Sequence, residues 1–208
     1  MKISYGITVC NEYEEIFQLI PHILQHKRVE DEIVVLVDLT KNTPDSQLLG
    51  YLHNLSSNNI ITLVEDNFNN HFADWKNRLT KACTGDYIFQ IDADEVPTVN
   101  LLENLPYILE NSDTQVILVP RVNTVEGLTE KHIKQWNWTV DVKGRINWPD
   151  YQWRIYKNDP KITWVNKVHE KLSGFSTFSD LPADEMWALE HHKDIERQER
   201  QNEFYNII

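Results

Sequence analysis

The sequence predicts an α/β fold in which a doubly wound, mostly parallel sheet is followed by a mixed-strand, Trp-rich C-terminal half. Three observations support this prediction. Short apolar segments alternate with segments whose apolar residues recur at helical spacing. Several strand-like segments are apolar without interruption, which is typical of strands covered on both faces. After Pro120 the alternation is lost, and residues 121–175 contain five of the seven tryptophans.

The first half of the chain reads as strands and helices in strict alternation. We expect strands at residues 3–9, 32–38, 60–64 and 86–91. We expect helices between them at residues 13–26, 42–55 and 71–83. Strand–helix repeats of this kind join neighbouring parallel strands, so this half predicts a parallel sheet.

The second half is less regular. A helix, a strand, an alternating strand, a hairpin turn and a charged C-terminal helix are expected in turn at 100–109, 115–119, 151–156, 157–160 and 184–208. The chain shows no repeat and no low-complexity linker. We therefore expect one domain, 1–208, made of two unequal halves at 1–97 and 98–208.

Length and charge limit the classes of partner. The 208 residues carry a formal net charge of −12, which argues against broad binding to nucleic acid or to an anionic membrane. A phosphate-bearing ligand would need a local cation to offset this field. The N-terminus reads as a strand rather than a signal peptide, and no apolar run reaches bilayer length. We expect a cytoplasmic protein, with peripheral membrane association left open.

Three acidic residues follow the fourth predicted strand. Asp92, Asp94 and Glu95 stand where parallel sheets bind ligands, at the carboxyl ends of the strands. Like charges this close repel each other unless a cation compensates them, and Mg²⁺ or Mn²⁺ takes one or two carboxylates together with substrate phosphates. The sequence therefore points to a metal site, although an acidic turn held in water stays an alternative.

Two common phosphate-binding motifs are missing from the sequence. Cys10-Asn11-Glu12 follows the first strand in place of a glycine-rich loop, and the chain has six glycines in all. Neither the dinucleotide-binding motif nor the Walker motif is present. This excludes the ordinary dehydrogenases and P-loop enzymes and leaves phosphate binding to a metal and to side chains.

Eight segments, taken together, resemble glycosyltransferases of family 2 with the GT-A fold. They lie at residues 7–12, 33–38, 72–79, 82–88, 92–95, 153–158, 167–170 and 191–193. Their order and spacing are most similar to the branch that resembles lipopolysaccharide-core and capsule glycosyltransferases. The resemblance implies a nucleotide-binding half at 1–97 and an acceptor-side half with a C-terminal helix at 98–208.

The resemblance also implies roles for single residues. Asp38 matches the acid that hydrogen-bonds the nucleotide base, Asp92 the acid near the ribose and metal, and Asp94 the direct metal ligand. Lys76 matches a basic position near the nucleotide. Further positions on the nucleotide side are Thr8, Asn11, Glu12, Ala93 and Arg154. Val9, Cys10 and Leu39 depart from the common pattern, so the base pocket is expected to differ from the usual uridine type.

Four polar residues late in the chain are candidates for chemistry. Glu170 is our candidate for the base that takes the acceptor proton, and a surface ion pair is the alternative. His169 beside it is expected to order the loop, touch a phosphate or bind metal, or else to be structural. His191 is the candidate third metal ligand with Asp92 and Asp94, whereas the role of His192 stays open.

The tryptophans divide into two groups by position. Trp148, with Tyr151 nearby, is expected to reach the acceptor, because aromatic rings stack on sugar faces. The other tryptophans of the second half are expected in the core.

The leading hypothesis is a metal-dependent, inverting glycosyltransferase that uses Mn²⁺ or Mg²⁺. Its sugar donor would be a UDP-sugar or another nucleotide sugar, and its acceptor a carbohydrate, a lipid-linked glycan or a protein. Inversion rests on the resemblance, so retention stays open. One alternative is an inactive carbohydrate-binding or assembly subunit. The other is a nucleotidyltransferase, which would need a glycine-rich basic loop after the first strand.

Overall fold

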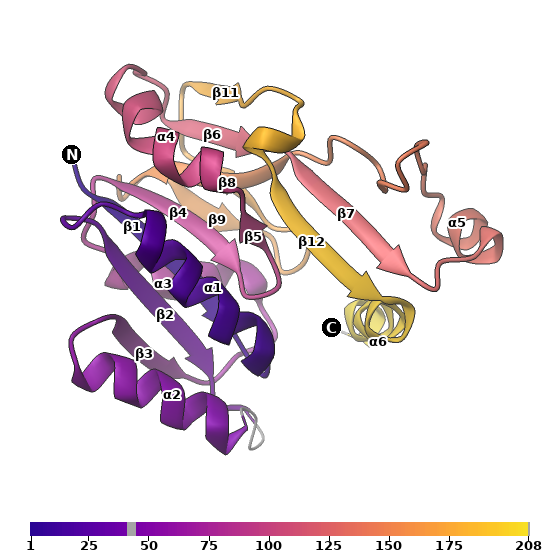
Figure 1. Cartoon of the computed structure of the whole chain (residues 1–208), viewed down its shortest axis with the longest axis horizontal. Helices are drawn as coiled ribbons and strands as arrows, with labels where there is room; N and C mark the ends of the chain where they lie inside the picture. Colours follow the sequence, from indigo (N-terminus) through magenta and orange to yellow (C-terminus); the bar gives the residue numbers. More distant parts are fainter. Residues whose placement is uncertain (41–44, 208) are drawn as a thin grey trace.

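A seven-stranded sheet forms the centre of the computed structural model, which describes residues 1–40 and 45–207 (Figure 1). The strand order is β11-β6-β8-β4-β1-β2-β3. The strands are β1 (Ile3–Val9), β2 (Glu32–Asp38), β3 (Thr62–Asp66), β4 (Tyr87–Asp92), β6 (Val116–Val119), β8 (Gln152–Lys157) and β11 (Phe178–Asp180). Four neighbouring pairs are parallel, and only β8 runs antiparallel to β4 and β6. The prediction of an α/β fold with a mostly parallel sheet is confirmed.

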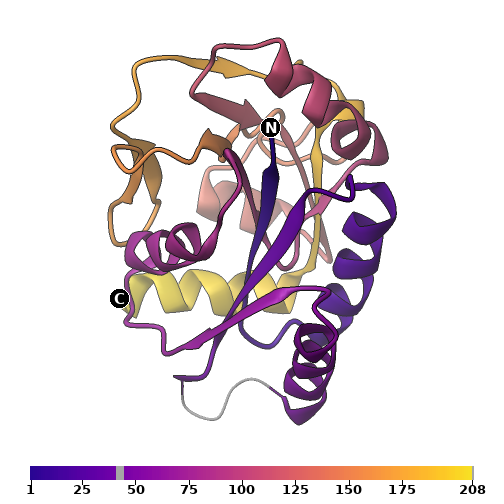
Figure 2. The same cartoon turned by 90° about the vertical axis from the view of Figure 1, so that its left-hand side faces the viewer.

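Helices cover both faces of this sheet (Figures 1 and 2). On one face lie α1 (Tyr13–His26), α2 (Ser46–Ser57) and α4 (Val99–Glu110), whose leucines and isoleucines share a core with the odd-numbered residues of β1. On the other face lie α3 (Phe72–Ala82) and the hairpin of β9 (Thr163–Val165) and β10 (Lys171–Ser173). All seven residues of β1 are buried, as expected for a strand covered on both faces.

A second, three-stranded sheet extends from the carboxyl edge of the first. Its order is β5-β12-β7, with β5 (Val96–Pro97), β7 (Arg121–Glu126) and β12 (Leu189–Asp194). A short helix, α5 (Glu130–Trp136), follows β7 on a projecting end, and a single 3-10 turn, η2 (Glu185–Trp187), precedes β12. Because β5 comes directly after the acidic turn, this small sheet brings the end of the chain to the three acids.

The prediction of a continuous helix from Asp184 was wrong. Residues 189–194 form β12, and only α6 (Ile195–Ile207) is helical after it. Side chains of β12 alternate strictly between buried and exposed, and the inward ones include His191 and Lys193. Because polar residues occupy inward positions, the alternation does not show as a change between apolar and polar residues. The charged composition therefore led to the prediction of a surface helix where the structure has a strand.

Three smaller differences concern element boundaries. The predicted start of the second helix at 42–44 lies outside the described residues, and α2 has Asp45 as its N-cap. The third strand begins two residues later than expected. Residues 157–160 do turn the chain, but β9 pairs with β10 and not with β8, so the turn closes no hairpin.

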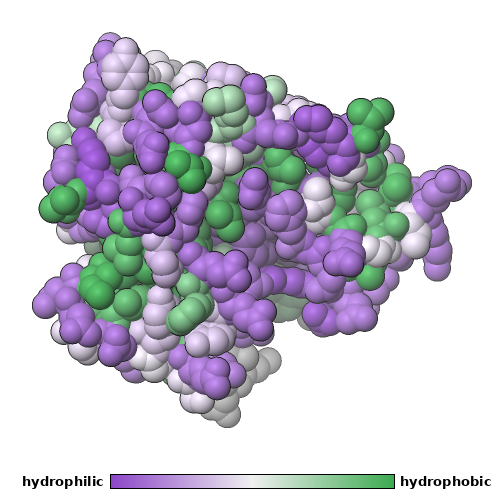
Figure 3. Space-filling model, viewed as in Figure 1, coloured by the Kyte–Doolittle hydropathy of each residue, from purple (hydrophilic) through white to green (hydrophobic). Residues whose placement is uncertain are grey.

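Helix α6 crosses the carboxyl ends of the central strands (Figure 2). None of its described side chains, residues 195–204, is buried. The face in Figure 3 is largely hydrophilic, with apolar side chains gathered between α1 and α2 and on the projecting end that carries α5. Among the described residues, no helix combines the length and the apolar character needed to cross a membrane.

Candidate active site

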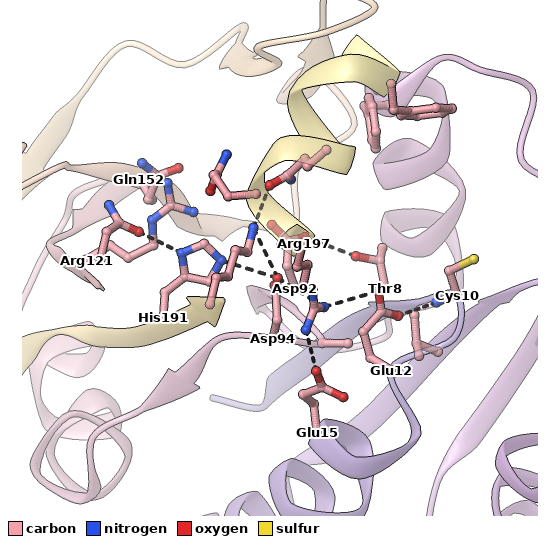
Figure 4. Close-up of a pocket in the computed structure, with 18 of the residues that line it drawn as sticks. Thr8, Cys10, Glu12, Glu15, Asp92, Asp94, Arg121, Gln152, His191 and Arg197 are labelled. Atoms are coloured by element: carbon pink, nitrogen blue, oxygen red, sulfur yellow. Dashed lines mark hydrogen bonds and ion pairs between the residues drawn. The ribbon is translucent and has the colours of Figure 1, made fainter. Parts of the chain in front are cut away.

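A cleft of about 980 Å³ opens at the carboxyl ends of the central strands (Figure 4). Its walls come from the ends of β1, β2 and β4, from α3, from β7 and β12, and from α6. All predicted site residues line this cleft: Thr8, Asn11, Glu12, Asp38, Lys76, Asp92, Ala93, Asp94, Arg154, His169, Glu170 and His191. The fold therefore brings together side chains that lie up to 183 positions apart in the sequence.

Two of the three acids belong to a network that we call the Arg154 cluster, made of Gln90, Asp92, Glu95, Arg121 and Arg154. The Arg154 guanidinium donates to Asp92 Oδ2 at 2.5 Å, to Glu95 Oε1 at 2.6 Å and to Gln90 Oε1 at 2.8 Å. Arg121 Nη1 donates to Glu95 Oε1 at 2.9 Å. Glu95 is fully buried and Arg154 is 3% exposed, so these charges are paired inside the protein. Such pairing is what makes their burial tolerable.

Asp92 is held on both carboxylate oxygens. Oδ1 accepts hydrogen bonds from Thr8 Oγ1 at 3.0 Å and Gln90 Nε2 at 2.9 Å, while Oδ2 is taken by Arg154. Burial raises the pKa of Asp92, but the Arg154 and Lys76 charges outweigh burial and hold the pKa below its usual value. Asp92 is therefore a firmly ionised and firmly positioned carboxylate.

The third acid belongs to a different group, the Asp94 cluster, made of Asp94, His191, Lys193 and Arg197. β12 pairs antiparallel with β5, with Glu190 opposite Val96, so the following residues of β12 run back past the acidic turn. Asp94 Oδ2 lies 3.2 Å from His191 Nε2, 3.4 Å from Lys193 Nζ and 3.4 Å from Arg197 Nη2. Figure 4 shows His191 and Arg197 converging on Asp94.

The protonation of His191 follows from its other neighbours. Asn123 Nδ2 donates to Asp150 Oδ2, which turns Asn123 Oδ1 toward His191 Nδ1 at 2.6 Å. Nδ1 therefore carries the proton and donates it. Burial lowers the pKa of His191, while the Asp94 carboxylate opposes this shift by raising it. When the proton of the neutral ring is on Nδ1, the lone pair of Nε2 lies on the side of Asp94. Two acceptors that face each other at 3.2 Å suit a shared cation.

The donor set thus fits a divalent cation held by few protein ligands. Asp94 Oδ2 and His191 Nε2 converge, whereas both oxygens of Asp92 are engaged elsewhere. Within the described part of the chain, no group of three or more His, Cys, Asp and Glu side chains is arranged to hold a metal. Mg²⁺ and Mn²⁺ sites of this kind are completed by water and by substrate phosphates.

Glu170 lines the same cleft and lies beside Lys76. Lys76 Nζ is 2.6 Å from Glu170 Oε1, 3.6 Å from Asp92 Oδ1 and 4.7 Å from the centre of the Trp164 ring. Burial raises the pKa of Glu170, but the Lys76 ammonium outweighs burial and lowers the pKa overall. Glu170 is therefore ionised at neutral pH. His169 next to it is exposed and has a left-handed backbone, with φ of 53°.

The first loop is shaped by Glu12. Its Oε2 accepts from the backbone N–H groups of Cys10 at 2.8 Å and Asn11 at 3.0 Å, while burial raises the pKa of this carboxyl. On the next strand, Asp38 Oδ1 accepts from the N–H groups of Thr40 and Phe68 at 2.8 and 3.0 Å. Both acids therefore fix the loops that border the cleft.

Ala93 joins the first loop region to the acidic turn. Its N–H donates to the Thr8 carbonyl at 3.1 Å, which continues the parallel pairing of β1 and β4 past the last strand residue. This backbone hydrogen bond fixes the position of the chain directly before Asp94, at the end of the sheet.

The aromatic residues that line the cleft are not those expected to reach the acceptor. Trp138 and Trp153 line the cleft, while Trp148 lies under Arg145 at 4.3 Å and the Tyr151 hydroxyl donates to the Leu181 carbonyl. The contact of Trp148 and Tyr151 with the acceptor stays a prediction.

Four residues that matter in this geometry were not predicted from the sequence as site residues: Asn123, Asp150, Lys193 and Arg197. The signal for Lys193 was available, since it stands two positions after His191 on a strand and so shares its face. His192, left open by the sequence, is exposed and bonds Thr124 instead.

Comparison with known families decides the classification. The model of glycosyl transferase family 2 matches residues 4–185. The chain belongs to this family. The matched region ends before β12, so His191, Lys193 and Arg197 lie beyond it.

Similar solved structures agree on the fold. The structure of S. aureus TarS residues 1–349 superposes with a TM-score of 0.63 at 15% identity, covering 92% of this chain and 60% of that chain. TarS 1–349 in complex with UDP-GlcNAc gives 0.62 at 16% identity, covering 93% and 59%. This chain thus spans about 60% of the length of the TarS chain that it matches. None of the curated proteins matches the sequence.

Proposed function

We propose that this protein transfers a sugar from a nucleotide sugar to a hydroxyl group, with a divalent cation at Asp94 and His191. The observation that carries the proposal is the convergence of Asp94 Oδ2 and His191 Nε2 at 3.2 Å, at the ligand-binding edge of a family 2 sheet. TarS, which shares the fold, binds UDP-GlcNAc. A UDP-sugar is therefore the first sugar donor to test, with the departures at Val9, Cys10 and Leu39 as the reason to test others.

Asp94 and His191 are the residues that would hold the cation. When bound there, Mn²⁺ or Mg²⁺ would neutralise the diphosphate that leaves the sugar. Asn123 keeps the lone pair of His191 Nε2 directed at the site. Asp38 lines the cleft at the end of β2, and its Oδ2 lies 3.8 Å from Cys10 Sγ. It is the proposed hydrogen-bonding partner of the nucleotide base.

Glu170 is the proposed base in an inverting reaction. Its carboxylate takes the proton of the acceptor hydroxyl while that oxygen bonds to the anomeric carbon. The bond between the anomeric carbon and the diphosphate oxygen breaks at the same time, and the nucleoside diphosphate leaves. The lowered pKa of Glu170 keeps it unprotonated at neutral pH, as this role requires. The acceptor would approach along the wall that contains Trp138 and Trp153.

Calorimetric titration tests the sugar-donor site. UDP, GDP and their sugars are titrated into the protein with Mn²⁺ and, separately, with chelator. We expect Mn²⁺-dependent binding of one nucleotide, and Asp94→Ala should weaken it by about 10³-fold, because several kcal/mol of ligand contact are lost. Absence of nucleotide binding by folded protein under every condition would contradict the proposal and favour the inactive-subunit alternative.

Transfer assays with Glu170→Gln test the base. The variant should bind the nucleotide sugar as the wild type does and should transfer the sugar about 10²- to 10⁴-fold more slowly. Asp194→Asn is a useful comparison, because it also changes a carboxylate of the cleft, leaves Glu170 in place and keeps a side-chain oxygen for the Arg197 N–H. Full transfer activity in Glu170→Gln would show that another group is the base.

A further inference from the structure

The end of the chain places two basic side chains beside the proposed metal ligand. Lys193 Nζ and Arg197 Nη2 each lie 3.4 Å from Asp94 Oδ2, the same oxygen that faces His191. Lys193 is 8% exposed and the Arg197 side chain 27% exposed, so water screens these charges only in part. A divalent cation bound at Asp94 would therefore meet two positive charges at close range.

Both cations have further partners that keep them over the cleft. Arg197 forms an ion pair with Glu15 and lies 3.6 Å from Glu12, and both of these acids belong to the first loop and α1. Lys193 Nζ donates to Gln201 Oε1 of α6 at 2.6 Å. Loss of the contact with Asp94 would therefore leave both side chains at the cleft and close to any anion bound there.

The helix that holds Arg197 is attached mainly through such polar contacts. No described side chain of α6 is buried, and near its far end Phe204 meets Phe72 of α3 edge-on, with ring centres 6.5 Å apart. Because the side chains of residues 195–204 bury little apolar surface, small shifts of this part of α6 over the cleft cost little free energy. Arg197 can then follow a ligand without disturbance of the central sheet.

We propose that Lys193 and Arg197 form a cation clamp that pairs with Asp94 until the sugar donor binds, and then grips the diphosphate of that donor. This inference rests on the proposed function. When the metal binds Asp94, it replaces Lys193 and Arg197 as the partner of this carboxylate. The diphosphate of the sugar donor then forms ion pairs with the two cations. Metal and diphosphate consequently bind cooperatively. The metal releases the two cations from Asp94 for the diphosphate, and the diphosphate draws the two cations away from Asp94 and so favours the metal.

The cation clamp predicts that loss of one of its charges changes the affinities for Mn²⁺ and for pyrophosphate in opposite directions. In Arg197→Gln or Lys193→Gln, Mn²⁺ alone should bind about tenfold more tightly, because one competing cation is gone. Pyrophosphate without metal should bind the same variants about tenfold more weakly, because one of its cationic partners is gone. A merely structural role would not move the two affinities in opposite directions.

The experiment measures both binary affinities on the full chain. Mn²⁺ binding is followed by electron paramagnetic resonance of free Mn²⁺, and pyrophosphate binding by calorimetry in chelator-treated buffer. Arg200→Gln is the matched control, since it removes a charge from the same helix and cleft but makes no contact with Asp94 among the described residues. Its Mn²⁺ affinity should stay within about twofold of the wild type, and Arg197→Lys should keep most of both affinities.

Each outcome decides a different part of the inference. Opposite shifts in Arg197→Gln or in Lys193→Gln, with an unchanged control, support the clamp; Lys193→Gln carries the test if the helix variant does not fold. Shifts of both affinities in one direction, or of neither, overturn it. If wild-type protein binds neither Mn²⁺ nor pyrophosphate, the proposed metal site fails together with the clamp. If Asp94-dependent Mn²⁺ binding is present but the variants show no opposite shifts, only the clamp fails.

Discussion

The Arg154 cluster and the Asp94 cluster start from acids two residues apart, yet they differ in almost every physical respect. In the Arg154 cluster the acids are paired with buried Arg154 and partly buried Arg121, both of which lie in strands, and both oxygens of Asp92 are engaged. In the Asp94 cluster three cationic or neutral partners share one oxygen, and one of them comes from a helix in which none of the side chains described, those of residues 195–204, is buried. The Arg154 cluster is therefore suited to stabilising the fold, and the Asp94 cluster to an exchange of the partners of its carboxylate.

The same substitution, arginine to methionine, should give the largest difference in stability between the two clusters. Arg154→Met leaves the fully buried Glu95 with Arg121 as its remaining guanidinium partner and removes the ion pair of Asp92 Oδ2, which should lower the free energy of unfolding by about 3–5 kcal/mol. Arg197→Met removes a partly exposed ion pair and should cost no more than about 1 kcal/mol. Urea unfolding of both variants measures the difference. Equal costs would show that the Asp94 cluster is as structural as the Arg154 cluster.

Asn123 tests the link between the clusters, because it joins Asp150 and Arg121 to His191. In Asn123→Ala the imidazole can place its proton on either nitrogen, so Mn²⁺ affinity should fall about 10- to 100-fold. Thr124→Ala is the control, since it removes the neighbouring contact between β7 and β12 at exposed His192. Calorimetry with Mn²⁺ alone measures both variants, and equal effects would argue against a role in orienting His191.

The smallest effect is expected at a third charged group, at the opposite edge of the sheet. Glu32 accepts hydrogen bonds from Lys2, Ser4 and Thr84; burial raises its pKa, but these bonds outweigh burial and lower the pKa to about 2. A carboxyl with a lowered folded pKa stabilises the protein above its unfolded value, about 4.5, and loses this contribution as the pH falls toward 2.

Wild-type stability should therefore decline more steeply than that of Glu32→Gln between pH 4.5 and 2. Urea unfolding at several pH values measures the two slopes. Identical slopes would mean that Glu32 gains nothing from its partners. Because the acids of the cleft titrate in both proteins, the comparison isolates this one carboxyl.

The candidate site was predicted in part from the sequence, and the division follows a physical rule. Asp92, Asp94 and Asp38 were assigned correctly to one edge, because the carboxyl ends of parallel strands must lie together. The roles of Glu170, His169 and Arg154 stay predictions, although all three line the cleft. Arg154 was expected on the nucleotide side, and in the structure its terminal nitrogens donate to Gln90, Asp92 and Glu95.

The parallel half of the sheet and the acidic turn could be predicted from the sequence, because both depend on local periodicity and on short-range spacing. The side chains that contact Asp94, in contrast, depend on the tertiary fold. His191, Lys193 and Arg197 lie about a hundred positions away, and they reach Asp94 through the pairing of β12 with the two residues of β5. Such long-range register depends on the packing of the whole chain, so no local pattern contained it.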